Sequence, residues 1–172
     1  MMRKLRKVLM LAVIALLLGA CSRGHDTAPV VERVNDVYAS VFEHYEFALQ
    51  DSVDGTASPL DALDSMYCTA DWNALLARVK YQDSRLGEGV MGFMDADYWV
   101  MGQDWQYLAL SDVKVTSMTD TTATVELNLH NCGQVIPVRL EMLLEADEWR
   151  IDNFIDVKND FDWKVIMKEY VD

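Results

Sequence analysis

The sequence has few of the residues that usually build metal centres and nucleophilic sites. It holds three histidines and three cysteines among 172 residues. A structural zinc site takes four Cys or His ligands in closely spaced pairs, and His130 and Cys132 form a pair with no second pair to match. Cys68 and His130 likewise have no third residue that would orient them as nucleophile and base. The sequence therefore predicts no metal, no cofactor and no cysteine nucleophile.

Basic residues are also scarce, and four of the fifteen lie at the amino terminus, ahead of the apolar run VLMLAVIALLL at 8–18. This run is too short to span a bilayer comfortably, so the pattern is typical of an export signal at residues 1–20. Removing that segment leaves 11 basic against 28 acidic residues, a net charge of −17. A field of this sign repels nucleic acid and anionic lipid headgroups, and we expect no nucleic-acid partner.

The apolar run ends in Leu-Gly-Ala-Cys at 18–21, which resembles the lipobox of bacterial lipoproteins. The resemblance implies that cleavage leaves Cys21 as the first residue, with a thioether-linked diacylglycerol and a further acyl chain to hold it on a membrane. Ser22 follows Cys21 where an aspartate would favour the inner membrane, so we expect the periplasmic side of the outer membrane. Residues 21–28 form a short polar tether. The alternative is an ordinary signal peptide followed by a buried Cys21.

The remaining residues, 29–172, suffice for one domain with its own core. Apolar residues recur at helical spacing over 29–49. Ser58 and Pro59 are suited to begin a second helix that runs to about Tyr67. Thr69 can cap a third helix. One face of that third helix carries Trp72, Leu75, Leu76 and Val79.

Beyond residue 110 the apolar spacing changes from helical to alternating. The alternation predicts strands at 112–118, 122–130, 135–145 and 149–155. Residues 161–170 then resemble a short amphipathic helix. We therefore predict an α+β domain with N-terminal helices packed on a curved antiparallel sheet of about four strands. In the last strand the predicted core-facing residues are Trp149, Ile151, Asn153 and Ile155.

Helices followed by a long antiparallel meander resemble the cone-shaped nuclear transport factor 2-like fold, also described as SnoaL-like or cystatin-like. The segments DADYWVMGQDW at 95–105 and EWRIDNFID at 148–156, with MKEYV at 167–171, are similar to a family of bacterial lipoproteins of unknown function that has this fold. The resemblance covers residues 30–171. It implies a cone with a short C-terminal helix and carries over no activity, since the fold hosts both enzymes and binding modules.

Residues 92–105, GFMDADYWVMGQDW, are rich in acids and aromatics and follow neither helical nor strand spacing. A calcium loop is not expected, because the fifth and twelfth positions counted from Asp95 are Trp99 and Gln106. The aromatics either close the open end of the cone or form a recognition surface. The candidate ligand- or partner-binding residues are Asp95, Asp97, Tyr98, Trp99, Gln103, Asp104 and Trp105.

Cys68 and Cys132 remain once Cys21 is acylated. In an oxidising compartment they either form a disulfide or stand as one buried and one exposed thiol.

The strand positions expected to face the core hold almost no acidic or basic residue. This favours a non-enzymatic, lipid-anchored binding module whose partner is a protein, a wall fragment or a small hydrophobic ligand. One alternative is a small isomerase or dehydratase with Asp97 or Asp104 as base and Tyr98 as hydrogen-bond donor. Another is an immunity protein against a basic toxin, whose association the negative charge would accelerate. A spacer role within a larger lipoprotein assembly is the third.

Overall fold

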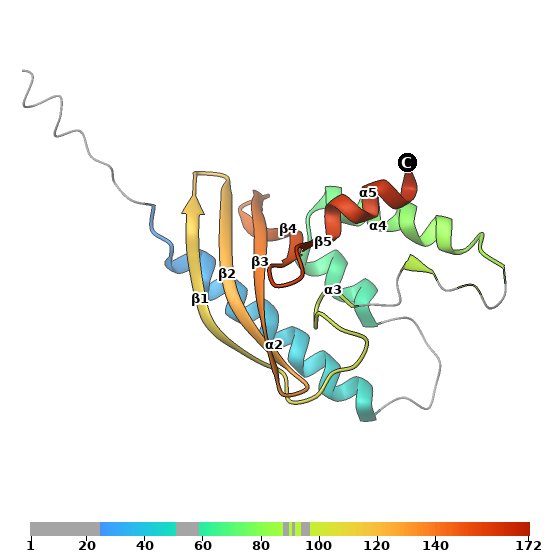
Figure 1. Ribbon diagram of the computed structural model, residues 1–172. Helices are drawn as coiled ribbons and strands as arrows, with labels where there is room; N and C mark the ends of the chain where they lie inside the picture. Colours follow the sequence, from blue (N-terminus) through green and yellow to red (C-terminus); the bar gives the residue numbers. More distant parts are fainter. Residues whose placement is uncertain (1–24, 51–58, 88–89, 91, 94–96) are drawn as a thin grey trace, which may run out of the picture.

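The computed structural model describes residues 25–50, 59–87, 90, 92–93 and 97–172. Helices come first, an antiparallel sheet follows, and a short helix ends the chain (Figure 1). The predicted signal peptide, Cys21 and Asp95 lie outside the described residues. Within the described part of the chain, no helix is both long and apolar enough to cross a membrane.

The three N-terminal helices lie where the spacing of apolar residues predicts them. They are α2 (Ala28–Gln50), α3 (Pro59–Tyr67) and α4 (Ala70–Asp83). Thr69 caps α4, because its Oγ1 accepts a 3.1 Å hydrogen bond from the backbone N–H of Trp72. The predicted apolar face of α4 is buried as a whole: Trp72, Leu75, Leu76 and Val79.

The sheet is an open meander in which every neighbouring pair is antiparallel. Its order is β1-β2-β3-β4-β5, so each strand pairs with the next one along the chain. The strands are β1 (Ala109–Met118), β2 (Thr122–Asn131), β3 (Gln134–Glu145), β4 (Glu148–Asp156) and β5 (Phe161–Asp162).

The fifth strand corrects the predicted C-terminal helix, which was expected to begin at Phe161. Phe161 and Asp162 pair with the end of β4, so α5 spans Trp163–Val171. Asp162 then caps α5 by accepting a 3.0 Å hydrogen bond from the backbone N–H of Val165.

The core lies between α2 and the sheet and continues under α3 and α4. Figure 1 shows α2 crossing behind the long strands β1–β3, with α4 and α5 side by side beyond β4. The largest fully buried side chains are Trp72, Trp99, Tyr38, Tyr98 and Phe154.

A bulge in β4 reverses the predicted orientation of the second half of that strand. Ile151 pairs with Met142 and Asn153 with Glu141, which leaves Asp152 as an extra residue. Beyond it, Phe154 lies opposite the core residue Leu140 and is itself fully buried. The prediction that Asn153 and Ile155 face the core is therefore wrong, since an extra residue moves every following side chain to the other face.

Of the two arrangements expected for Cys68 and Cys132, the structure has the one without a disulfide: Cys68 is a buried free thiol and Cys132 an exposed one. Cys68 forms an isolated β-bridge with Ile151, which pairs with Met142, whereas Cys132 lies two residues before Gln134, near the opposite end of β3. Met142 stands eight residues after Gln134, which corresponds to about 25 Å of strand. A disulfide joins Cα atoms only about 4.4–6.8 Å apart, so these two thiols cannot meet.

Candidate functional site

The segment that the sequence singles out folds into a small closed turn against the core. Asp97 and Gly102 form an antiparallel bridge, with N–H to O=C distances of 2.9 and 3.1 Å. Inside it, Tyr98, Trp99 and Val100 are fully buried. Tyr98 and Trp99 therefore pack into the core and belong to no exposed surface.

Asp64 on α3 forms hydrogen bonds with two side chains of this turn and was not identified from the sequence. Its carboxylate is 1% exposed and accepts hydrogen bonds from the hydroxyl of Tyr98 at 2.6 Å and from Nε1 of Trp99 at 3.1 Å. Burial, together with this carboxylate, holds the pKa of Tyr98 well above its ordinary value. One signal was present: Asp64 stands at a core-facing position of the helical spacing Leu60, Leu63, Asp64, Tyr67.

Asp97 forms a second pair, with Tyr45 of α2. Its carboxylate accepts a hydrogen bond from the Tyr45 hydroxyl and another, at 2.8 Å, from the backbone N–H of Trp99. Burial raises the pKa of Asp97, although these hydrogen bonds act in the opposite direction. Burial and the adjacent carboxylate also raise the pKa of Tyr45.

These pairs differ from the acid–base arrangement considered from the sequence. The hydroxyl of Tyr98 donates to Asp64 and is buried. It is therefore not free to act as the predicted hydrogen-bond donor beside Asp97 or Asp104. Asp104, the other proposed base, is exposed, as is Gln103. Both line a shallow pocket of about 300 Å³ beside the β2–β3 turn.

A second pocket opens where α2 meets the residues that follow this turn, and we call it the aromatic pocket. Its volume is about 350 Å³. Trp105 packs edge-on against Tyr45 at 5.0 Å between ring centroids, and its buried Nε1 has no hydrogen-bond partner. Tyr107 is 84% exposed and has a φ of 54°, a left-handed conformation that a tyrosine rarely adopts. The lining residues are Phe42, Tyr45, Glu46, Trp105, Gln106, Tyr107 and Leu108.

Asn131 forms hydrogen bonds that link residues 100–106, which include part of the aromatic pocket's lining, to the sheet. It is 4% exposed, at the end of β2. Its Nδ2 donates 2.9 Å hydrogen bonds to the carbonyls of Val100 and Asp104, and its Oδ1 accepts one at 3.0 Å from the N–H of Gln106. The next residue, Cys132, donates its N–H to the carbonyl of Gln106 at 2.9 Å. Sequence spacing gave no sign of this role, because the contacts span 25 to 31 residues.

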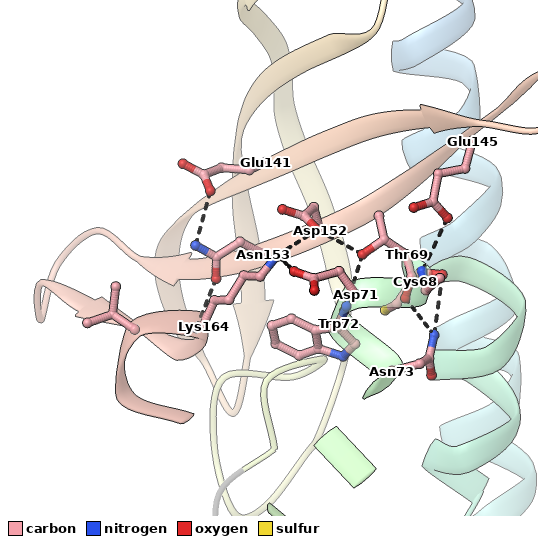
Figure 2. Close-up of polar contacts among 12 residues, drawn as sticks. Cys68, Thr69, Asp71, Trp72, Asn73, Glu141, Glu145, Asp152, Asn153 and Lys164 are labelled. Atoms are coloured by element: carbon pink, nitrogen blue, oxygen red, sulfur yellow. Dashed lines mark hydrogen bonds and ion pairs between the residues drawn. The ribbon is translucent and has the colours of Figure 1, made fainter. Parts of the chain in front are cut away.

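A separate network of charges joins α4, β4 and α5. Nζ of Lys164 lies 2.7 Å from Asp152 and 2.7 Å from Asp71, and Thr69 donates a 2.8 Å hydrogen bond to Asp152 (Figure 2). Burial alone would lower the pKa of Lys164, but the two carboxylates outweigh it and raise that pKa. Every charge in the network has a partner inside the protein, so we assign it to structure.

Metal ligands do not gather anywhere among the described residues: no group of three or more His, Cys, Asp or Glu side chains is placed to hold an ion. His130, the histidine of the weak metal motif, instead lies 2.9 Å from Ser111 on β1 through its Nε2.

No protein-family model and no curated protein sequence matches the chain. Among solved structures, the chain is similar to a phospholipid-binding protein from Ralstonia solanacearum, which was solved in complex with a phospholipid. The two are 12% identical, the match covers 84% of this chain and 83% of the other, and the TM-score is 0.36. A likeness of this degree supports no conclusion about this chain.

Proposed function

We propose that the protein is a non-enzymatic binding module of the bacterial cell envelope that takes a small ligand in the aromatic pocket. The observation that carries the proposal is the pocket itself: aromatic walls and an exposed tyrosine with a strained backbone. Strained residues tend to cluster at functional sites. The volume of about 350 Å³ lies at the small end of the range for ligand sites.

The interior carboxylates support a binding role over a catalytic one. Asp64 accepts hydrogen bonds from two donors of the protein and lines neither of the two pockets described above. Such a carboxylate stabilises the fold and has no route to a substrate.

Binding in the aromatic pocket can be tested with Nile red, an uncharged dye that becomes fluorescent in apolar sites. The purified protein should show a saturable signal, which Tyr107→Ala weakens roughly fivefold, or about 1 kcal/mol, because the variant loses one aromatic wall. Tyr81→Ala is the matched control, since Tyr81 is also exposed, at 65%, but lies on α4. An absent signal, or an equal loss in both variants, would show that the pocket is not a ligand site.

The proposal includes a lipid anchor on Cys21, an outer-membrane address and an NTF2-like curvature of the sheet around α2. The anchor is supported by the basic, apolar and lipobox segments in their proper order. Cys21→Ser should abolish incorporation of labelled palmitate and release the protein from the membrane fraction. Cys132→Ser should still incorporate palmitate and stay in the membrane fraction. Palmitate that persists in Cys21→Ser would contradict the anchor.

One observation favours a second candidate, an acid–base enzyme. Asp97 has a raised pKa and is hydrogen-bonded to Tyr45, which lines the aromatic pocket. A proton could pass between a ligand and Asp97 through that hydroxyl. Incubating an envelope extract with the protein, and in parallel with Asp97→Asn, should consume a metabolite only in the first reaction. Mass spectra that change in neither or in both exclude this role for Asp97.

A further inference from the structure

We propose that the ligand of the aromatic pocket carries an alkylated ammonium group, such as a trimethylammonium. This inference rests on the proposed binding function and identifies the chemical class that the pocket would select.

The first argument comes from the aromatic walls. Phe42, Tyr45, Trp105 and Tyr107 make up four of the seven lining residues. Tyr45 and Trp105 meet at 67°, so their rings form the corner of a partial cage. An aromatic face carries a negative quadrupole and attracts a cation within about 6 Å, and cages of this kind bind quaternary ammonium groups.

The second argument comes from charge. Glu46 lines the aromatic pocket, and the carboxylate of Asp97 accepts a hydrogen bond from the hydroxyl of Tyr45, another lining residue. No Lys, Arg or His belongs to this lining, which consists wholly of described residues. A hydrogen bond to a carboxylate also makes a phenol ring richer in electrons, which strengthens its attraction for a cation. The pocket therefore favours positive over negative or neutral ligands.

The third argument concerns the degree of alkylation. A primary ammonium needs three hydrogen-bond acceptors to replace its water, whereas the pocket offers few beyond Glu46 and Gln106. A trimethylammonium presents methyl groups instead, which pack against aromatic rings without loss of hydrogen bonds.

Isothermal titration calorimetry of the purified protein with choline tests the inference. The matched ligand is 3,3-dimethyl-1-butanol, which has the shape of choline without its charge, and ethanolamine supplies the unmethylated ammonium. Choline should bind at least fivefold more tightly than either. If the neutral isostere binds as well as choline, the inference is wrong while the binding function stands. If Nile red does not bind either, the proposed function itself fails.

Variants separate the charge from the rings. Glu46→Gln should weaken choline about threefold to tenfold and leave the neutral isostere unchanged. Tyr107→Ala should weaken choline to a similar degree, Tyr107→Phe should restore it, and Tyr81→Ala should have no effect. Equal effects of Glu46→Gln on choline and on the isostere would overturn the role of charge.

Two sources could supply this group, a free metabolite or a lipid headgroup. Short-chain phosphatidylcholine below its micelle concentration, compared with choline and glycine betaine, distinguishes them. Tighter binding of the lipid identifies a headgroup, and tighter binding of the free compounds identifies a metabolite. Equal binding of short-chain phosphatidylethanolamine and phosphatidylcholine would contradict the inference, because it would show that methylation is not recognised.

Discussion

Asn131 fixes a segment that has no regular secondary structure of its own. Its three hydrogen bonds reach Val100, Asp104 and Gln106, on both sides of Trp105. The backbone of this segment therefore has partners although it lies outside the sheet. The geometry of the aromatic pocket depends on this one amide.

Asn131→Ala is expected to lower the free energy of unfolding by about 2–3 kcal/mol, because it leaves the buried carbonyl of Val100 and two half-buried backbone groups without partners. Urea unfolding followed by far-UV circular dichroism measures the change. Asn128→Ala is the control on the same strand: Asn128 donates to the exposed Asp112 and should cost less than about 1 kcal/mol. Similar losses in both variants would show that Asn131 has no special role.

Asp97 should give stability an unusual dependence on pH. Its folded-state pKa is raised above the ordinary value of about 4, so the folded protein holds this proton more tightly than the unfolded chain. Its contribution is therefore fully present below the unfolded pKa and is lost as the pH rises through the folded pKa.

We predict that the difference in the free energy of unfolding between Asp97→Asn and the wild type changes with pH. The stability of the variant relative to the wild type should increase as the pH rises from below about 4 through the raised pKa, and then stay constant. Urea unfolding of both proteins over this range measures it. A difference that is flat, or that moves the other way, would mean that the Asp97 pKa is not raised.

At the scale of residues, sequence reasoning identified the right segment but not the partners that define it. Tyr98 and Trp99 were candidates, yet Asp64, which accepts hydrogen bonds from both, lies 34 residues before Tyr98 and 35 before Trp99. Local spacing shows which face of a helix is apolar, and it cannot show which distant side chain meets that face. Asp97 was a candidate base, and its partner Tyr45 was only one residue of the helix predicted over 29–49.

At the scale of elements, periodicity predicted the helices and the long strands to within a few residues. It failed at the bulge in β4, because a single extra residue breaks the alternation on which the prediction depends. Placed at the bulge, Asp152 reaches Lys164 and Thr69. The bulge thus places the charge network that joins α4 to α5.

Two aspartates of this network provide a matched test, because each lies 2.7 Å from Nζ of Lys164. The side chain of Asp152 is 15% exposed and that of Asp71 is 70% exposed. Asp152→Ala should lower the free energy of unfolding by about 2–3 kcal/mol, since it leaves the buried ammonium of Lys164 with one partner fewer. Asp71→Ala should cost less than about 1 kcal/mol. Thermal and urea unfolding measure both, and the reverse order would contradict the assignment.

At the scale of the whole molecule, the order of elements was sufficient to predict an α+β domain with an antiparallel meander. The order of elements could not decide whether Cys68 and Cys132 form a disulfide, because it does not determine at which ends of the sheet the two cysteines lie. The structure places them at opposite ends of β3.

Thiol counting tests this arrangement and the lipid anchor together. In the native protein, a chromogenic thiol reagent should modify Cys132 rapidly and spare Cys68, which is buried and whose pKa is raised by burial. After denaturation without reductant, two thiols should react if Cys21 is acylated, and three if it is free. A count of zero with an acylated Cys21, or of one with a free Cys21, would indicate the disulfide.

The contact between Cys132 and Gln106 gives the molecule an attachment point for a reporter. The thiol is exposed at the β2–β3 turn, and its backbone is bonded to a residue that lines the aromatic pocket. A fluorophore coupled there would sit beside the ligand without replacing any lining side chain. The protein would then signal occupancy of the pocket optically, so libraries of small molecules could be screened before any natural ligand is known.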